Sequence, residues 1–493
     1  MKDNINVLFV SSEIAPFAKT GGLADVAGAL PYYLTNEGVN IRLLMPLYGF
    51  IDSKKYGIEK FSDQTFTVKI GSNNIEYQVC QGFLPESTIR SYFIKKDSYY
   101  HRDSIYVDPE NGHDWEDNAE RFALLSASAL EIISYIDFVP HIIHMNDWQS
   151  ALVPLYLREY YGQQEIYSRI KTLLSIHNIA YQGIFEIEKF EQLGLPSKYL
   201  KFGSGLEFWG RINFLKAGIV YSNLLNTVSK TYALEIQKSE EFGYGLEGVL
   251  KERKSDLFGI INGIDYNTWN PETDDNIYMN YNIFSIDNKI ENKKYLLRKL
   301  KLKSDERVPL ISLISRLVDQ KGIDLVQDRI NELLELDINL IILGTGEEKY
   351  HRFFSKVQQS HPDKVAVCLE FDNKLAHQIE AGSDIFLMPS KYEPCGLSQM
   401  YSLKYGTVPI VRDTGGLADT VKDFDPITKQ GNGFVFSNYD SKELLATVKR
   451  AITYFHKPQI WKIIVENGMS GDFSWSKSAI EYIKLYKKML GVS

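Results

Sequence analysis

Cysteine is scarce in this chain of 493 residues, which has only Cys80, Cys368 and Cys395. An odd, sparse set without clustered spacing is unlike the disulfide frameworks of small secreted proteins and fits reduced thiols. No group of cysteines and histidines has the spacing of a zinc site. His141 and His144 are close in sequence, but on an extended strand they face opposite sides. We therefore expect neither a disulfide framework nor a metal ion.

The chain also lacks long apolar runs and an excess of positive charge. No apolar stretch is long enough to cross a bilayer, and the first one, residues 5–10, is too short for a signal peptide. The formal net charge is -8, whereas a general nucleic-acid binder is normally basic. We expect neither a membrane nor a nucleic acid among the partners.

Two further absences narrow the fold class. There is no Gly-Lys-Ser/Thr string, which is the signature of P-loop nucleotide-binding proteins. There is also no low-complexity segment and no short-period repeat. The chain is nevertheless too long for a single hydrophobic core, so we expect two or more domains.

Short apolar segments alternate with helix-like patterns in the first half of the chain. This alternation predicts parallel sheets whose strands are joined by crossover helices. A helix is expected over residues 23–34. Strands are expected over residues 7–11, 41–45, 141–144, 171–176 and 224–228.

The same pattern restarts after residue 258, with strands expected over 308–313, 339–343, 365–369, 385–388 and 408–411. We predict an α/β chain of two facing Rossmann-like domains, residues 1–258 and 259–472. The final segment, 473–493, has apolar residues at helical spacing, and we expect it to return to the first domain. Such sheets bind ligands at the carboxyl ends of their strands, so the active site is expected in the inter-domain cleft.

Two nearly identical strings, KTGGLAD at residues 19–25 and TGGLAD at 414–419, each follow a predicted strand and open a predicted helix. Paired glycines allow backbone amides to approach a ligand, and a helix N-terminus favours an anion. Lys19, present only in the first string, can place a cation against a phosphate. A solvated lysine at the start of a helix is the alternative.

Two cations follow the strand predicted over 308–313. Arg316 and Lys321 are separated by a strand-to-helix turn and could together neutralise a diphosphate leaving group without a metal ion. Two ordinary surface charges are the alternative.

A carboxylate and a glycine follow the strand predicted over 385–388. Glu393 is suited to bind sugar hydroxyls, while Gly396 and Leu397 offer backbone amides at a helix start. This combination suits a nucleotide-sugar donor. A helix-capping carboxylate is the alternative for Glu393.

A fourth group of polar side chains ends two strands of the first domain. Asp147 and Trp148 follow one strand, and His177 and Asn178 follow the next. The carboxylate, imidazole and amide can bond sugar hydroxyls, and the indole can stack on a sugar ring. A first-domain ligand site is expected there.

Taken together, these motifs resemble the bacterial glycogen synthase and plastid starch synthase family. The shared strings run in order over almost the whole chain, and the ordered set is specific although any one string would be weak. They are KTGGLADV at 19–26, NFLKAG at 213–218, FGYGLEG at 242–248, NGID at 262–265 with WNP at 269–271, the Arg316/Lys321 segment, EPCGL at 393–397, TGGLADT at 414–420 and DFSW at 472–475.

This resemblance implies a GT-B glycosyltransferase. Members of the family transfer glucose from ADP-glucose to the non-reducing end of an α-1,4-glucan, with retention at the anomeric carbon. The implied partners are thus a nucleotide sugar and a glucan, and no metal ion or other cofactor is implied. The implied location is the cytoplasm of a bacterium or, for a processed protein, the plastid stroma.

The resemblance also assigns roles to residues. Glu393, with the Gly396 and Leu397 backbone, would hold the glucose and assist the departure of ADP, and His177 would contact the glucose near the reacting carbon. Phe371 stands where many members have an aromatic side chain that stacks on adenine. The catalytic set is Glu393, His177, Asp147, Lys321 and Arg316; the donor set is Lys19, Gly22, Arg316, Lys321, Phe371, Glu393, Gly396, Leu397 and Thr414; and the acceptor or cleft set is Asp25, Asp147, Trp148, Asn178 and Asn262.

Two other functions stay open at this point: a transferase of the same fold with another donor, such as UDP-glucose, and a non-catalytic glucan-binding or priming protein. The presence of Lys19, Arg316, Lys321 and Glu393 argues against the second. Retention could proceed through a covalent carboxylate intermediate or by same-face attack guided by the leaving phosphate. No nucleophile is evident near His177, which favours same-face attack.

Overall fold

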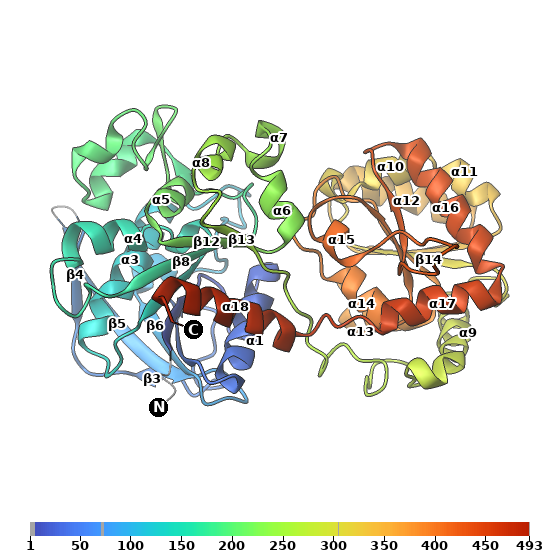
Figure 1. Ribbon diagram of the computed structural model, residues 1–493, viewed down its shortest axis with the longest axis horizontal. Helices are drawn as coiled ribbons and strands as arrows, with labels where there is room; N and C mark the ends of the chain where they lie inside the picture. The colour runs from blue at the N-terminus through green and yellow to red at the C-terminus, as the bar shows by residue number, and fades with distance from the viewer. Residues whose placement is uncertain (1–4, 71–72, 304, 493) are drawn as a thin grey trace. The chain divides into compact units, whose positions relative to one another are not determined.

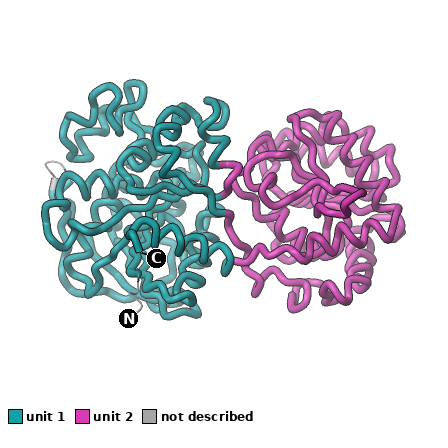
Figure 2. Tube along the Cα trace, in the orientation of Figure 1, with its two compact units in different colours: residues 1–228, 233–260, 475–493 teal, residues 229–232, 261–474 magenta. Residues whose placement is uncertain are grey.

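A computed structural model describes residues 5–70, 73–303 and 305–492 of the chain. Two compact units are distinguished in it (Figure 2). Unit 1 comprises residues 1–228, 233–260 and 475–493, and unit 2 comprises residues 229–232 and 261–474. The main boundaries fall after residues 260 and 474, slightly beyond the expected 258 and 472, and residues 229–232 join unit 2.

Unit 1 is built on a ten-stranded sheet that is parallel through most of its width (Figure 1). Its strand order is β13 (Leu257–Gly259), β12 (Leu224–Thr227), β8 (Lys171–Ile176), β7 (Ile142–Asn146), β1 (Asn6–Val10), β2 (Asn40–Pro46), β6 (Arg90–Lys95), β5 (Asn73–Phe83) and β3 (Glu59–Lys60), with β4 (Phe66–Ile70) paired to β5. The strands from β13 to β6 are parallel, whereas β3 and β4 pair with β5, and β5 pairs with β6, in antiparallel fashion.

Helices cover both faces of this sheet, which explains the continuous apolar strands. Val7, Leu8, Phe9 and Val10 of β1 have no exposed surface. The helices with residues in unit 1 are α1 (Gly22–Asn36), α2 (Asp97–Tyr100), α3 (Asn118–Glu131), α4 (Val153–Tyr156), α5 (Phe214–Tyr221), α6 (Lys230–Glu235), α7 (Glu240–Gly243), α8 (Glu247–Glu252) and α18 (Trp475–Leu490). A separate antiparallel sheet joins β10 (Glu207–Phe208), β11 (Arg211–Asn213) and β9 (Ile184–Phe185).

The last helix, α18, lies beside α1 in unit 1 (Figure 1). A buried chain of hydrogen bonds ties it to three strands. The Tyr486 hydroxyl lies 2.8 Å from His144 Nδ1, and His144 Nε2 lies 2.6 Å from the Ser175 hydroxyl. Ser175 donates in turn to the Asn226 side chain, whose Nδ2 donates to the Tyr482 hydroxyl at 3.1 Å.

This chain of bonds assigns the protons of the imidazole. Because Ser175 donates its hydrogen to Asn226, its oxygen accepts from His144 Nε2, which leaves Nδ1 to accept from Tyr486. Burial lowers the pKa of His144 to about 3, so the ring is neutral. Each side chain of this network therefore has a hydrogen-bond partner and none is charged. The network fixes the position of the terminal helix on the sheet.

Unit 2 has a six-stranded sheet that is parallel throughout. Its strand order is β16 (Val365–Cys368), β15 (Asn339–Leu343), β14 (Leu310–Ile314), β17 (Ile385–Met388), β18 (Val408–Arg412) and β19 (Phe434–Phe436). Its helices are α9 (Lys289–Lys299), α10 (Ile323–Asp328), α11 (Ile330–Glu335), α12 (Glu348–Ser360), α13 (Asn373–Gly382), α14 (Ser398–Lys404), α15 (Gly415–Thr420), α16 (Ser441–Phe455) and α17 (Pro458–Met469).

The predicted α/β class with two parallel sheets is confirmed. Each strand expected from the sequence is present, with its ends shifted by two residues at most, and the helix expected over 23–34 is α1. None of the helices within the described ranges is long and apolar enough to cross a membrane.

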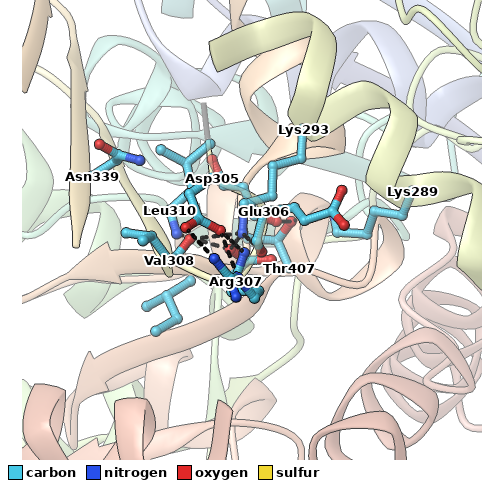
Figure 3. Close-up of polar contacts among 12 residues, drawn as sticks. Lys289, Lys293, Asp305, Glu306, Arg307, Val308, Leu310, Asn339 and Thr407 are labelled. Atoms are coloured by element: carbon cyan, nitrogen blue, oxygen red, sulfur yellow. Dashed lines mark hydrogen bonds and ion pairs between the residues drawn. The ribbon is translucent and has the colours of Figure 1, made fainter. Parts of the chain in front are cut away.

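A buried ion pair between Lys293 and Asp384 lies at the amino-terminal edge of the unit 2 sheet. Figure 3 labels Lys293 together with Glu306, Val308 and Leu310. Lys293 of α9 donates to the Asp384 carboxylate at 2.6 Å and to the carbonyls of Glu306 and Val308 at 2.8 Å. The same carboxylate accepts the amide of Leu310, the first residue of β14, at 2.8 Å. One lysine therefore satisfies three oxygens at the point where two strands begin.

Lys293→Met should destabilise unit 2 by about 3–5 kcal/mol, because it leaves the Asp384 carboxylate buried without its cation. The measurement is the urea midpoint of unfolding. The adjacent Lys294 pairs with Glu291 and Glu306 at the surface, where solvent screens the charges, so Lys294→Met is the matched control and should leave the midpoint close to that of wild type. Equal effects of the two substitutions would contradict this account.

Candidate active site

The loops after three parallel strands bring the predicted unit 2 residues together. Arg316 and Lys321 follow β14, Glu393 follows β17, and Thr414 follows β18. Because β14, β17 and β18 are neighbours in the sheet, their carboxyl ends share one edge. The candidate site of unit 2 is at this edge, where α/β sheets bind ligands.

Lys321 and Glu393 form an ion pair at the centre of this cluster. Lys321 Nζ lies 2.5 Å from Glu393 Oε2, and the two side chains are only 15% and 9% exposed. The Ser390 hydroxyl donates to the same oxygen at 3.1 Å. Within the described chain, Glu393 Oε1 has no hydrogen-bond partner, so this oxygen remains able to accept from a ligand hydroxyl.

Backbone amides complete the cluster beside Glu393. Leu397 is the N-cap residue of α14, and Gly396 before it has a φ of +69°. The amides of Gly396 and Leu397 have no acceptor among the residues that the structure describes. Two unbonded donors next to a buried lysine form a site for an anionic group.

The paired glycines of the second string serve a purpose other than the one expected from the sequence. A Cβ at Gly415 would lie 1.9 Å from the Glu393 carbonyl oxygen, and one at Gly416 would lie 1.9 Å from that of Cys395. The Gly416 amide donates to the Glu393 carbonyl at 3.0 Å. These glycines therefore allow the loop that contains Glu393 to pack against α15.

The other unit 2 candidates differ in their surroundings. Arg316 is exposed, Thr414 is buried, and Phe371 is 86% exposed in the loop between β16 and α13. Asn262 is buried, its side-chain oxygen has no partner in the described chain, and its backbone amide bonds the Cys395 thiol. The structure thus places Asn262 beside the Glu393 loop with an acceptor to spare.

In unit 1, the ends of β7 and β8 hold Asp147 and His177. Asp147 has a φ of +53°, and its Oδ1 accepts the His177 amide at 2.7 Å. The Asn178 amide also bonds this carboxylate. Burial nevertheless raises the pKa of Asp147 to about 7, against the effect of these two bonds. Asp147 therefore positions the backbone of residues 177 and 178.

The protonation of His177 follows from its neighbour. Asn146 Nδ2 donates to the Val10 carbonyl at 3.0 Å, so its Oδ1 faces His177 Nε2 at 2.9 Å and accepts a hydrogen bond from the Nε2–H group. Burial lowers the pKa of His177 to about 4, which makes the ring neutral. Nδ1, which has no partner in the described chain, keeps a lone pair for a hydroxyl.

The Lys19 loop depends on a residue that the sequence analysis missed. Glu13 is buried, and its Oε2 accepts the amides of Thr20 and Gly21, the latter at 3.1 Å. Its Oε1 accepts the Tyr106 hydroxyl at 2.6 Å. An internal carboxylate thus occupies the amides that we assigned to an outside anion. Glu13 comes three residues after the end of β1, behind the buried Ser11 and Ser12, and this position was the available signal.

The remaining residues of this loop stay accessible. Lys19 Nζ lies 2.7 Å from Asp25 Oδ1, and both side chains are exposed. Gly22, the first residue of α1, has open space where a Cβ would be. Asn178 uses its side-chain oxygen to accept the Ala180 amide at 3.0 Å, so it shapes the turn after His177.

The prediction that Trp148 stacks on a sugar ring is wrong. Its indole is buried and lies edge-on to Phe122 at 4.9 Å and to Phe185 at 5.7 Å between ring centroids. A Cβ at Gly183 would lie 2.3 Å from the indole, so the backbone there covers the ring. The side chain belongs to the core beneath the His177 loop.

Comparison with known proteins identifies related chains. Residues 6–252 match the family model for the starch synthase catalytic domain, and residues 298–462 match that for group 1 glycosyl transferases. The glycogen synthase of Thermotoga maritima is 45% identical over 490 residues, which cover 99% of each chain. That of Fervidobacterium nodosum is 46% identical over 489 residues, covering 98% of this chain and 99% of the relative.

Solved structures agree with these relatives. The catalytic domain of starch synthase IV from Arabidopsis thaliana, bound to ADP and acarbose, superposes with a TM-score of 0.88 and 32% identity, covering 99% of this chain and 100% of that chain. Sucrose-phosphate synthase from Thermosynechococcus elongatus shares the fold, with a TM-score of 0.60 and 15% identity over 99% of this chain and all of that one.

Asp147→Asn should change the pH dependence of stability. The wild-type carboxyl has a pKa near 3.8 in the unfolded chain and about 7 in the folded protein, so folding favours its protonated form. The resulting contribution to the free energy of unfolding is complete below pH 3.8 and is lost once the pH passes 7. The asparagine does not titrate. The free energy of unfolding of the variant minus that of wild type should therefore increase by about 2–3 kcal/mol when the pH is raised from 5 to 8. Urea unfolding at both pH values measures this, with the exposed Asp137→Asn as control.

Glu13→Gln should loosen the Lys19 loop, because the amide side chain replaces a carboxylate that accepts two backbone amides. A charge-assisted bond is worth about 1.5–3 kcal/mol, so hydrogen exchange at Thr20 and Gly21 should accelerate by about tenfold or more. Mass spectrometry of peptides covering residues 18–24 measures it. Glu37→Gln, at the exposed end of α1, is the control; unchanged exchange in Glu13→Gln would refute the anchoring role.

Proposed function

Because the chain belongs to the glycogen synthase and starch synthase family of GT-B glycosyltransferases, we propose that it elongates α-1,4-glucans. It transfers glucose from ADP-glucose to the non-reducing end of the glucan, with retention, and releases ADP. Full-length similarity to glycogen synthases supports the reaction. The ADP in the starch synthase IV complex supports the donor.

The Lys321–Glu393 pair with the adjacent free amides is the observation that supports this function most directly. Cleavage of a nucleotide sugar builds negative charge on the diphosphate and positive charge on the anomeric carbon. Lys321, Arg316 and the amides of Gly396 and Leu397 stabilise the first, and the Glu393 carboxylate binds a sugar hydroxyl through Oε1. These groups supply the charge that a metal ion supplies elsewhere, so we propose a metal-independent reaction.

In unit 1, His177 and Lys19 are the groups that contact ligands. The lone pair on His177 Nδ1 accepts a sugar hydroxyl, and Lys19 exchanges its partner Asp25 for a donor phosphate. Asp147 acts through the backbone that it holds. Asp25 and Asn178 contribute to the acceptor side of unit 1 in this proposal.

Retention proceeds in this proposal by same-face attack. A covalent intermediate needs a carboxylate nucleophile, and the carboxylate beside His177 is Asp147, whose Oδ1 already accepts a backbone amide and whose raised pKa disfavours the charged form. A departing phosphate oxygen can instead accept the proton of the attacking hydroxyl on the same face. We further place the protein in the bacterial cytoplasm, in line with its bacterial relatives.

The test is transfer of labelled glucose to a maltooligosaccharide, with ADP-glucose and UDP-glucose in parallel and chelator present. Strong incorporation from ADP-glucose is expected, and Glu393→Ala should reduce it about a hundredfold or more while glucan binding is kept. The control is Glu335→Ala, an exposed carboxylate of α11. Transfer only from UDP-glucose would overturn the donor assignment. Glucan binding without any transfer would favour the non-catalytic alternative.

A further inference from the structure

A tryptophan forms the tip of a tight hairpin in unit 1. Trp209 and Gly210 join β10 to β11, and their φ values are +58° and +80°. Two-residue hairpin loops with two positive φ values normally contain Asn-Gly or Asp-Gly, because a bulky side chain is strained in that conformation. Such strain persists where the residue has a use.

The core does not use this tryptophan. Its side chain is 82% exposed, and the ring that contacts it is that of Phe208, its neighbour in the chain, at 6.2 Å between centroids. A large apolar ring held in solvent in a strained turn gains nothing from folding. Its exposure in this turn points to a ligand that covers the ring.

The hairpin is fastened to the loop that follows His177. Asn213 Nδ2 of β11 donates to Gln182 Oε1 at 2.6 Å, and Gln182 Nε2 donates to the carbonyls of Ile179 and Tyr244 at 3.1 Å. The side chain before Gln182 is Tyr181, which is 57% exposed. The hydrogen bonds of Gln182 thus connect the hairpin of Trp209 and the segment of Tyr181 to the loop that follows His177.

The hairpin is also rigid. Lys216 donates to the Glu207 carbonyl, and the Gly210 amide donates to the Glu207 side chain at 3.0 Å. Arg211 pairs with Glu186 of the neighbouring segment at 2.8 Å. Aromatic faces pack on the C–H faces of pyranose rings, and polar side chains at their edges bond the hydroxyls. This combination suits a sugar polymer better than an apolar protein surface, because the ring stands among charged groups.

We propose that Trp209, with Tyr181, is a binding platform for the acceptor glucan, at glucose units away from the reacting end. This inference rests on the proposed function, which supplies an α-1,4-glucan as the polymer. The platform lengthens the contact between the enzyme and a long chain, whereas a short acceptor does not reach it. It therefore acts on binding of long glucans and not on the chemical step.

The first test is affinity electrophoresis of Trp209→Asn through gels containing glycogen. Asparagine favours the positive φ of this turn, so the variant should fold at least as stably as wild type, which thermal unfolding verifies. Loss of one stacked ring should weaken glycogen binding about three- to tenfold. Trp209→Tyr should bind within about twofold of wild type, because it keeps an aromatic face.

The matched control is Phe202→Asn, an exposed aromatic side chain of the same unit at 98% exposure, which should bind glycogen like wild type. Kinetics gives a second readout: Trp209→Asn should raise the KM for glycogen but leave unchanged kcat, the KM for ADP-glucose and the KM for maltotriose. Unchanged glycogen affinity in Trp209→Asn, or an equal loss in Phe202→Asn, would overturn the platform.

The binding assay does not depend on catalysis, so the two proposals fail separately. If wild type transfers no glucose but Trp209→Asn still loses glycogen affinity, the platform stands and the synthase assignment falls. If transfer is intact and Trp209→Asn binds glycogen normally, the synthase assignment stands and the platform falls.

Discussion

Burial of both faces of two parallel sheets is the constraint on which the rest of the molecule depends. Strands such as β1, whose residues 7–10 have no exposed surface, leave no room for polar side chains along their length. The polar residues of the candidate site accordingly lie in the loops after the strands, where Glu13, Asp147, His177, Lys321 and Glu393 are found. His144, a polar residue that does lie between the layers, is neutral, and both of its ring nitrogens are bonded.

Internal partners keep the charges at these strand ends in place before any substrate arrives. Glu393 holds Lys321, Asp25 holds Lys19, and Glu13 holds the amides of the Lys19 loop. Under the proposed function, a donor phosphate would therefore meet lysines that are already ordered by carboxylates. Glu13 differs from the other two because it is buried and bound on both oxygens, so it acts as a fixed part of the loop.

Much of this arrangement could be predicted from particular sequence patterns. The strands at 171–176, 339–343 and 385–388 have the predicted bounds, because short apolar runs between turn residues leave little choice of register. Trp148 and Glu13 could not be assigned in the same way. An aromatic residue after a strand can either pack in the core or contact a ligand. For Trp148 the choice depends on the packing of Gly183 against the indole, which the sequence does not reveal. The glycines at 415 and 416 likewise suggest anion binding until the carbonyls they face are known.

The bonds from α18 to β7 and β12 bear on the order in which the protein is made. Residues 475–490 complete the packing of unit 1, yet they are synthesised after every residue of unit 2. A nascent chain that has emerged as far as residue 474 can fold unit 2 but leaves His144 and Asn226 without their tyrosine partners. Unit 1 is thus the first to be translated and the last to be finished, and a chain that stops at residue 474 leaves unit 1, and not unit 2, incomplete.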